Sequence, residues 1–335
     1  MKKILSFIAV IALIGGIGAG YLYSQLFSSP FQHTETAYIF IDSDDTADSI
    51  RNKVQAVGAK SMTGYDLMAK LKKYGDKHRT GKYAVKPGAN MFELVREMAN
   101  GIQVPTKLVI PTARTVDKIT AAISKQLMID SLSLAEALHS ADLKDFNKET
   151  LPALFIPDTY EVYWDITPEK LVARLQKEHD KFWNATRLQK AKDAKLTPVE
   201  VATLASIVES ETNYGPEKAR VAGLYLNRLH TGMLLQSDPT VKFALQKFEL
   251  KRILFEHLTY DSPYNTYKYA GLPPGPICIP TPAGMDAVLD YEKHNFIYMC
   301  AKEDFSGSHN FAVSLAEHMN NARKYQQALN QRGIK

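Results

Sequence analysis

The sequence has few cysteines and lacks the residue clusters that mark several common kinds of functional site. Its two cysteines, Cys278 and Cys300, do not form a CxxC pair and have no neighbouring cluster of metal ligands, which excludes a zinc site. Nothing resembles a phosphate-binding loop, a metal cluster or a Ser-His-Asp set, so we expect no cofactor. The sequence leaves open whether the two thiols form a disulfide.

The sequence also lacks a strong excess of charge of either sign. It has 41 lysines and arginines against 36 aspartates and glutamates, and no basic cluster alternates with aromatic residues. Nucleic acid is therefore not an expected partner. We find no internal repeat and no low-complexity segment. The 335 residues, 45% hydrophobic and 23% charged, are enough for about two or three domains.

The one long apolar run lies at the N-terminus, where residues 4–23 contain no charged side chain. This is about the length of a helix that crosses a bilayer. Lys2 and Lys3 precede the run and no lysine directly follows it. This predicts a single-pass anchor in the inner (cytoplasmic) membrane, with residues 1–3 in the cytoplasm and the rest on the outer, periplasmic side. A cleaved signal peptide is the alternative, although the run is longer than a usual signal core.

The remaining pattern of apolar residues predicts an α+β fold with several parts. Residues 24–36 are polar and are expected to form a linker. Residues 37–105 are predicted to form strand, helix, helix, strand and helix, a small α/β subdomain suited to binding. Residues 106–190 are expected to be a connecting helical region, and residues 191–335 a larger mixed α+β domain. One amphipathic helix is predicted over residues 168–186.

The strongest helix signal in the sequence starts at Thr197. Thr197 is a natural N-cap, Pro198 fits the first helical position, and Glu200 can complete a capping box with Thr197. Apolar residues then recur at helical spacing, Val201 and Leu204 among them, which predicts one buried face.

Glu209 lies where this buried face ends. It is one turn beyond Ala205 and two turns beyond Ala202, on a stripe of very small side chains. We therefore expect its carboxyl group at the edge of the apolar face, above a gap. Burial disfavours the charged form, and a carboxylic acid that keeps its proton can protonate a leaving oxygen. The alternative is an ordinary solvated helix glutamate.

Several motifs occur in an order and spacing typical of one family. They are LASIVESET (204–212), NRL (227–229), LQSDPTV (235–241), YNTY (264–267), GLPPGPI (271–277) and GSHNF (307–311). Together they resemble the MltG/YceG-like endolytic murein transglycosylases, and FIPDTYEVY (155–163) is similar to an FPDTY stretch of that family. TGKYAVKPG (80–88) resembles the end of its N-terminal LysM-like domain, so the subdomain over residues 37–105 is expected to be LysM-like.

The resemblance implies cleavage of peptidoglycan glycan strands between N-acetylmuramic acid (MurNAc) and N-acetylglucosamine (GlcNAc). It further implies 1,6-anhydro-MurNAc ends, termination of nascent strands, and peptidoglycan synthases as partners. Glu209 matches the family's catalytic glutamate, which makes residues 191–335 the catalytic domain. The Glu209-Ser210 pair also resembles that of lysozyme-like transglycosylases, and so implies a lysozyme-like catalytic helix. The family often has lysine at the position of Ser210, a departure that does not affect the chemistry.

A single carboxyl group is enough for this reaction. Ordinary glycosidases use two, one as acid and one as base or nucleophile. Here the attacking group would be the 6-hydroxyl of the sugar itself, which is tethered close to the bond that breaks. Glu209 could protonate the leaving oxygen and then remove the proton from that hydroxyl.

Candidates for substrate binding are polar and aromatic residues of these motifs: Gln236, Asp238, Tyr264, Asn265, Tyr267 and His309. Their polar groups suit hydrogen bonds to the glycan, and the two tyrosines could stack on sugar faces. Structural alternatives exist: tyrosines in the core, a histidine held by its own partners, and an aspartate that caps the helix after it. Glu211, two residues beyond Glu209, faces another side of the helix, so we expect a structural role for it.

Two other functions stay open. A peptidoglycan hydrolase on the same fold would use water, and its products would have reducing ends instead of anhydro ends. A non-catalytic, membrane-anchored peptidoglycan-binding protein would not need Glu209. The complete set of motifs argues against the binding protein, because binding alone requires no buried carboxyl group beside a groove.

Overall fold

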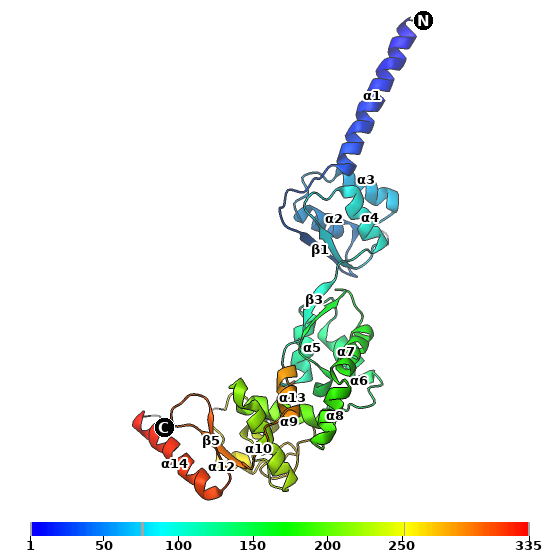
Figure 1. Cartoon of the computed structure of the whole chain (residues 1–335). Helices are drawn as coiled ribbons and strands as arrows, with labels where there is room; N and C mark the ends of the chain where they lie inside the picture. The colour runs from blue at the N-terminus through cyan, green and yellow to red at the C-terminus, as the bar shows by residue number, and fades with distance from the viewer. Residues whose placement is uncertain (1, 75–76, 251, 334–335) are drawn as a thin grey trace. The chain divides into compact units, whose positions relative to one another are not determined.

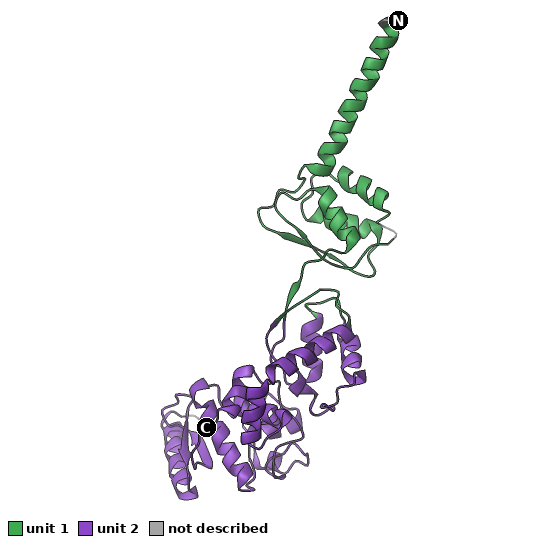
Figure 2. Cartoon of the chain, turned by 45° about the vertical axis from the view of Figure 1, so that its right-hand side comes forward, with its two compact units in different colours: residues 1–108, 125–129, 160–167 green, residues 109–124, 130–159, 168–335 purple. Residues whose placement is uncertain are grey.

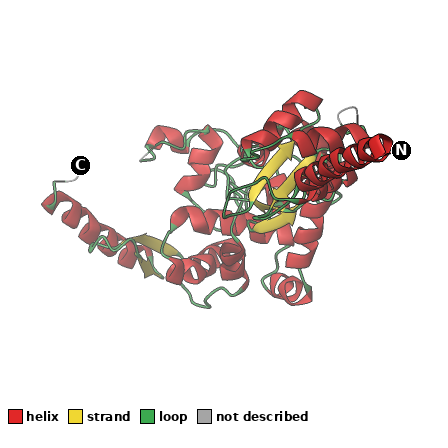
Figure 3. Ribbon diagram, turned by 90° about the horizontal axis from the view of Figure 1, so that it is seen from above, coloured by secondary structure: helices red, strands yellow, loops and turns green. Residues whose placement is uncertain are grey.

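Helices dominate the described chain, and its strands are few and short (Figure 3). The computed structural model describes residues 2–74, 77–250 and 252–333. Within these residues the strands form three two-stranded sheets. This mixture of helices and small sheets confirms the predicted α+β class.

The chain forms two compact units (Figure 2). Unit 1 consists of residues 1–108, 125–129 and 160–167, and unit 2 of residues 109–124, 130–159 and 168–335. Unit 1 contains α1 (Lys2–Phe27), β1 (Ala37–Ile41), α2 (Ala47–Ala56), α3 (Thr63–Lys72), β2 (Gly81–Val85) and α4 (Met91–Asn100). The paired strands β3 (Thr106–Val109) and β4 (Thr159–Val162) lie where the chain passes from one unit to the other.

The remaining elements belong to unit 2, and Figure 1 labels most of them. The first group is α5 (Val116–Ser124), α6 (Ser131–Ser140), the 3₁₀ turn η1 (Leu151–Leu154), α7 (Pro168–Phe182) and α8 (Ala185–Asp193). The second group is α9 (Pro198–Glu211), the 3₁₀ turn η2 (Gly215–Glu217), α10 (Lys218–His230), α11 (Asp238–Leu245), α12 (Phe255–Leu258), α13 (Pro282–Leu289), β5 (Tyr298–Ala301), β6 (His309–Ala312) and α14 (Leu315–Gln331).

The helix α1 is long and apolar enough to cross a membrane. Residues Lys3–Phe27 contain a window with a mean hydropathy of 2.2, and none of that window is buried. In the part of the chain that the structure describes, no other helix meets this criterion. Membrane anchors and signal segments share these properties.

The segment after the predicted span is packed against unit 1. Helix α1 continues past residue 23 to Phe27, whose ring lies 5.1 Å from that of Phe92. The Gln25 side chain accepts a hydrogen bond from the Ser61 hydroxyl, and Phe31 is buried. Residues 24–36 are therefore not the free linker that their polar composition predicts.

Unit 1 has a core of its own beneath the antiparallel pair β1–β2. In this pair Ala37 lies opposite Val85. Ile39, Ile41 and Tyr83 are fully buried against the helices, since alternate residues of a strand point to one face. The order strand, helix, helix, strand, helix predicted for residues 37–105 is confirmed.

A distant segment completes unit 1. The Asp165 carboxylate accepts hydrogen bonds from the Thr80 hydroxyl at 2.7 Å and from the Gln103 amide at 2.9 Å. The ring of Trp164 packs edge-on against Phe40 at 5.2 Å. Residues 160–167 therefore belong with unit 1, although the sequence groups them with the connecting helical region.

The single helix predicted over residues 168–186 is wrong, because two helices cover this stretch. Helix α7 ends at Phe182, and α8 begins at Ala185. The Asn184 side chain accepts a hydrogen bond from the Arg187 N–H and so caps the start of α8. Asparagine is a preferred N-cap, so Asn184 marks the start of a second helix in the sequence. The prediction of one helix followed the alternating charges and overlooked this residue.

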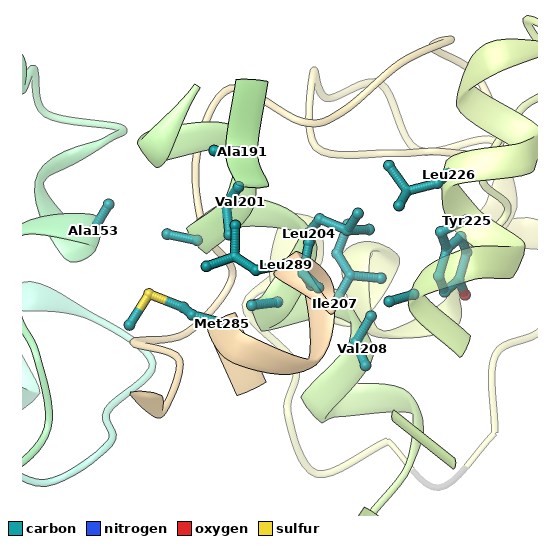
Figure 4. Close-up of a cluster of buried hydrophobic side chains, with 14 of the residues drawn as sticks. Ala153, Ala191, Val201, Leu204, Ile207, Val208, Tyr225, Leu226, Met285 and Leu289 are labelled. Carbon is teal, nitrogen blue, oxygen red and sulfur yellow. The ribbon is translucent and has the colours of Figure 1, made fainter. Parts of the chain in front are cut away.

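Helix α9 forms the centre of the unit 2 core. The predicted capping box is present: the Thr197 hydroxyl accepts from the Glu200 N–H, and the Glu200 carboxylate accepts from the Thr197 N–H at 2.7 Å. Residues 201–208 are all buried, and α9 packs against α13 and α10. Figure 4 shows Leu204 of α9 close to Leu289 of α13 within this core.

Gly275 is packed so closely that any side chain would strike the backbone. A Cβ there would lie 2.0 Å from the Glu149 carbonyl oxygen. We expect Gly275→Ala to lower the free energy of unfolding of unit 2 by about 3 kcal/mol, as measured by urea denaturation of the full chain in detergent. Gly215→Ala is the matched control, because a Cβ at Gly215 meets nothing within 4 Å. Equal stability of the two variants would contradict the close contact.

Candidate active site

Glu209 lies in the last turn of α9 and lines a pocket of about 510 Å³. Its side chain is only 11% exposed. The sequence prediction of a partly buried carboxyl group is therefore confirmed, and the solvated alternative is wrong.

Three hydrogen-bond donors surround the Glu209 carboxylate. The Thr281 backbone N–H donates to Oε2 at 2.9 Å, and the Thr281 hydroxyl donates to Oε1. The Lys218 ammonium donates to Oε1 at 2.9 Å and is itself only 19% exposed. These hydrogen bonds hold the Glu209 carboxylate in one orientation.

The pocket is the gap that the sequence predicts beside Glu209, whereas the stripe of small residues that leads to it is covered by α13. Helix α13 packs along α9, and a Cβ at Gly284 would lie 2.5 Å from the Glu209 carboxyl carbon. The small side chains of α9 therefore allow two helices to approach closely.

Local helix-start signals position both partners of Glu209. Thr281 is the N-cap of α13: its hydroxyl accepts from the Gly284 N–H at 3.0 Å and donates to Glu209. Pro282 follows at the first helical position, where its missing N–H is not needed. Lys218 is the first residue of α10, directly after the turn η2.

The pocket around Glu209 is polar and mainly basic. Its lining residues are Thr112, Ala113, Arg114, Glu209, Ser210, Asn213, Lys218, Pro239, Lys242, Phe248, Cys278, Ile279 and Thr281. Among these described residues, Glu209 carries the only carboxylate, against three cationic side chains.

Most of the predicted substrate-binding residues lie in a separate pocket. Gln236, Asp238, Tyr267 and His309 line a cavity of about 210 Å³, together with Glu211. Tyr264 instead lines a third pocket, of about 300 Å³, and its ring lies 4.7 Å from that of Phe243. The fold therefore distributes these five residues over two pockets of unit 2, and none of them lines the pocket of Glu209.

Asp238 does not cap the helix that follows it, so that alternative is wrong. Ser237 occupies the N-cap position of α11, and Asp238 lies in its first turn. The Asp238 carboxylate accepts a hydrogen bond from the Tyr267 hydroxyl at 2.6 Å. Burial, with help from this contact, raises the pKa of Tyr267 well above its usual value. The pair forms a fixed polar rim on the second pocket.

Asn265 has a structural position. It is fully buried, and its amide donates to the carbonyl oxygens of Leu258 at 2.9 Å and Tyr260 at 2.7 Å. Its own carbonyl oxygen accepts from the Tyr267 N–H. These bonds shape the loop that presents Tyr267, and they leave the Asn265 amide no group directed at a pocket.

His309 lines the second pocket but is held by the protein. Its Nδ1 lies 2.6 Å from Glu217 Oε1, and its backbone N–H donates to Glu217 Oε2 at 3.0 Å. The Thr212 hydroxyl donates to the same carboxylate at 3.0 Å. Glu217 thus joins the end of α9 to the start of β6. The His309 side chain is bound to Glu217 and is still 16% exposed where it lines the pocket.

Glu211 has the structural role that the sequence predicts. It accepts hydrogen bonds from the hydroxyls of Tyr225 at 2.7 Å and Ser237. Burial raises the pKa of Glu211, although these two hydrogen bonds oppose the effect. Glu211 therefore links α9 to α10 and to the loop before α11.

Both cysteines are free, which answers the question that the sequence left open. Burial raises the pKa of the Cys278 thiol to about 11, so this thiol remains protonated beside Glu209 at neutral pH. Within the described residues, no group of three or more histidine, cysteine, aspartate or glutamate side chains could hold a metal ion.

Sequence reasoning missed the partners of Glu209 and the basic residues of its pocket. Lys218 follows Glu209 by nine residues, but only the turn η2 between two helices makes them meet. Thr281 has a visible signal, a Thr-Pro pair that typically starts a helix, although nothing local points it to Glu209. Arg114, Lys242 and Phe248 show no motif and are assembled only by the fold.

Together the fold and the site define an α+β protein whose pocket presents a single, nearly buried carboxylate. The sequence profile of the YceG-like family matches residues 39–324, so the chain belongs to this family. The family resemblance seen in the motifs is thereby confirmed.

Proteins similar to this chain cover most of its length. The endolytic murein transglycosylase of Bacillus subtilis (strain 168) is 27% identical over 338 residues, 94% of this chain and 92% of that protein. The endolytic murein transglycosylase of Streptococcus pneumoniae serotype 2 is 25% identical over 89% of this chain, which spans 60% of the pneumococcal protein. The crystal structure of a YceG-like protein from Listeria monocytogenes matches with a TM-score of 0.57 and 25% identity, over 86% of this chain and 99% of that one.

Proposed function

We propose that this protein is an endolytic murein transglycosylase that cuts the MurNAc–GlcNAc bond of glycan strands and leaves 1,6-anhydro-MurNAc ends. One observation carries the proposal: of the described residues that line the pocket, Glu209 has the only carboxylate. Intramolecular attack by the 6-hydroxyl needs one such group, whereas hydrolysis commonly uses two. The names of the B. subtilis and S. pneumoniae relatives support the same activity.

In this mechanism Glu209 performs both proton transfers. Lys218 donates a hydrogen bond to Glu209 at 2.9 Å, so it is placed to supply the proton that makes Glu209 an acid. The acid protonates the leaving GlcNAc oxygen while the bond to the MurNAc anomeric carbon breaks. The carboxylate then takes the proton of the 6-hydroxyl as that oxygen bonds to the anomeric carbon. Glu209 is again protonated at the end, and the Thr281 donors keep it in position.

The other parts of the chain have supporting roles in this proposal. Residues 4–23 anchor the protein in the inner membrane, with the catalytic domain, residues 191–335, on the periplasmic side. The LysM-like subdomain, residues 37–105, binds glycan. Helix α9 acts as the lysozyme-like catalytic helix, and the protein works beside peptidoglycan synthases to end nascent strands.

Four of the predicted residues remain candidates for holding the sugars beside the cleaved bond. Gln236, Asp238, Tyr267 and His309 line one pocket with exposed polar groups. Tyr264 lines a neighbouring pocket and offers a half-buried ring. We leave Asn265 out of the substrate-binding set, because its amide is used within its own loop.

The test is the chemistry of the product ends. The full chain in detergent is incubated with purified peptidoglycan, and the released fragments are identified by mass spectrometry. We expect fragments that end in 1,6-anhydro-MurNAc, lighter by one water than those with reducing ends. Reducing ends would replace the proposal with a hydrolase that uses water. No release from several peptidoglycan preparations would favour a membrane-anchored binding protein.

A further inference from the structure

The pocket of Glu209 holds more positive charge than the cleavage chemistry uses. Lys218 is paired with Glu209, but Arg114 and Lys242 line the same pocket. Within the described chain, neither of these two side chains has a carboxylate within 4.0 Å. The sugar rings and the glycosidic bond of a glycan strand are uncharged, so they offer these two cations no electrostatic partner.

An aromatic ring that lines this pocket packs against the arginine. The Arg114 guanidinium lies 4.8 Å from the centre of the Phe248 ring, and the Lys118 ammonium lies 5.5 Å from the same centre. A guanidinium that stacks on a ring keeps its N–H donors in one plane, free for a second partner. Carboxylates match this planar fork and bind it with two parallel hydrogen bonds.

The charge has a chemical counterpart in murein but not in its sugar backbone. MurNAc carries a lactyl group, which ends in a carboxylate when no peptide is attached. When a stem peptide is attached, the lactyl carboxyl becomes an amide, and the peptide supplies carboxylates of its own. Either source brings an anion close to the bond that the reaction cleaves.

We propose that Arg114 and Lys242 form a subsite for a carboxylate borne by the MurNAc residue of the bound strand, either on the lactyl group or on the stem peptide. This proposal rests on the proposed function and extends it from bond cleavage to the choice of strand. The subsite sets specificity: a strand whose MurNAc carboxylates are removed or masked binds poorly, although its glycosidic bonds are unchanged.

The test compares three strands with the full chain in detergent. The first carries stem peptides, the second is peptide-free with free lactyl carboxylates, and the third is peptide-free with those carboxylates converted to methyl esters. Of the two strands that carry carboxylates, one is expected to have the lower KM with the wild-type protein. The KM of the esterified strand is expected to be at least about tenfold higher than this value, because a hydrogen bond to a charged group is lost. Its kcat stays within about twofold, since the reacting groups are unchanged.

Variants identify the residues. Arg114→Gln and Lys242→Gln are each expected to raise the KM of the charged strand about tenfold and to leave the KM of the esterified strand unchanged. Arg114→Lys keeps the charge and recovers part of the affinity. Lys247→Gln is the matched control. Lys247 lies just after α11, the helix that contains Lys242, and it is exposed and does not line the pocket.

The two sources of the carboxylate give different patterns. If the stem peptide supplies it, Arg114→Gln weakens only the peptide-bearing strand. If the lactyl group supplies it, Arg114→Gln weakens the peptide-free strand. The subsite is refuted if Arg114→Gln, Lys242→Gln and Lys247→Gln all give the wild-type KM for every strand.

A binding measurement separates this proposal from the proposed function. Labelled strands are titrated with Glu209→Gln protein, with and without Arg114→Gln, and fluorescence anisotropy reports the Kd. If the wild-type protein cleaves nothing, the proposed function fails. A tenfold weaker Kd with Arg114→Gln would still support the carboxylate subsite, and an unchanged Kd would overturn it.

Discussion

Glu209→Gln is expected to lower kcat on murein strands by about 10³-fold, the scale of a lost general acid and base. The amide has nearly the same shape as the carboxylic acid. It can still accept a hydrogen bond from the Thr281 N–H, so strand binding stays within about threefold of wild type. The amide cannot give a proton to the leaving oxygen or take one from the 6-hydroxyl. The measurement is single-turnover cleavage of labelled strands, with Kd from anisotropy.

Two companion variants make this result specific. Glu209→Asp keeps a carboxyl group, but the shorter side chain holds it farther from Lys218 and Thr281. We therefore expect a loss of kcat that is smaller than that of Glu209→Gln. Glu200→Gln changes another glutamate of α9, whose only described bond is the capping box, so kcat should match wild type. Activity of Glu209→Gln close to that of Glu200→Gln would remove Glu209 from the mechanism.

Gly284→Ala is expected to lower kcat by about 10²-fold without unfolding the protein, the second large effect. The added Cβ would lie 2.5 Å from the Glu209 carboxyl carbon and 2.6 Å from Oε1. Because a glutamate carboxyl ends a flexible side chain, it can move aside and leave the helices packed. Alanine also favours the helical backbone of α13 by about 1 kcal/mol over glycine, which offsets part of the crowding.

The measurement pairs activity with thermal unfolding. We expect a Tm within a few degrees of wild type and a kcat that pH does not restore, because the carboxyl is displaced. Gly215→Ala, which crowds nothing, should keep both values. Full activity of Gly284→Ala would mean that the observed position of Glu209 is not needed for catalysis. A large fall in Tm would mean that the core, and not the carboxyl, absorbs the added methyl group.

The local features of the site could be predicted from the sequence. The capping box at Thr197 fixed the start of α9, and helical spacing then put Glu209 at the end of a buried face. Both follow from contacts within a few residues, the range over which sequence patterns are informative. The catalytic assignment of Glu209 itself came from the ordered motifs and their family resemblance.

The partners of Glu209 could not be predicted because they depend on long-range packing. Thr281 is 72 residues away and reaches the carboxylate only because α13 lies along α9. The small side chains of α9 do not reveal which helix covers them; it is α13, which brings Gly284 against Glu209. The sequence predicts the same role, substrate binding, for Asn265 and Tyr267 of the YNTY motif. In the structure the Asn265 amide bonds to the backbone of its own loop, whereas Tyr267 lines a pocket.

Unit 1 also determines the order in which the chain can fold during synthesis. Besides residues 1–108, this unit needs residues 125–129 and 160–167, which follow later in the chain. The later segment supplies the Asp165 carboxylate, which accepts hydrogen bonds from Thr80 and Gln103. A ribosome delivers the chain from the N-terminus, so this unit stays incomplete until residue 167 has emerged, about half of the 335 residues. The N-terminal unit therefore cannot finish folding before residues 109–124 and 130–159 of unit 2 have been synthesised.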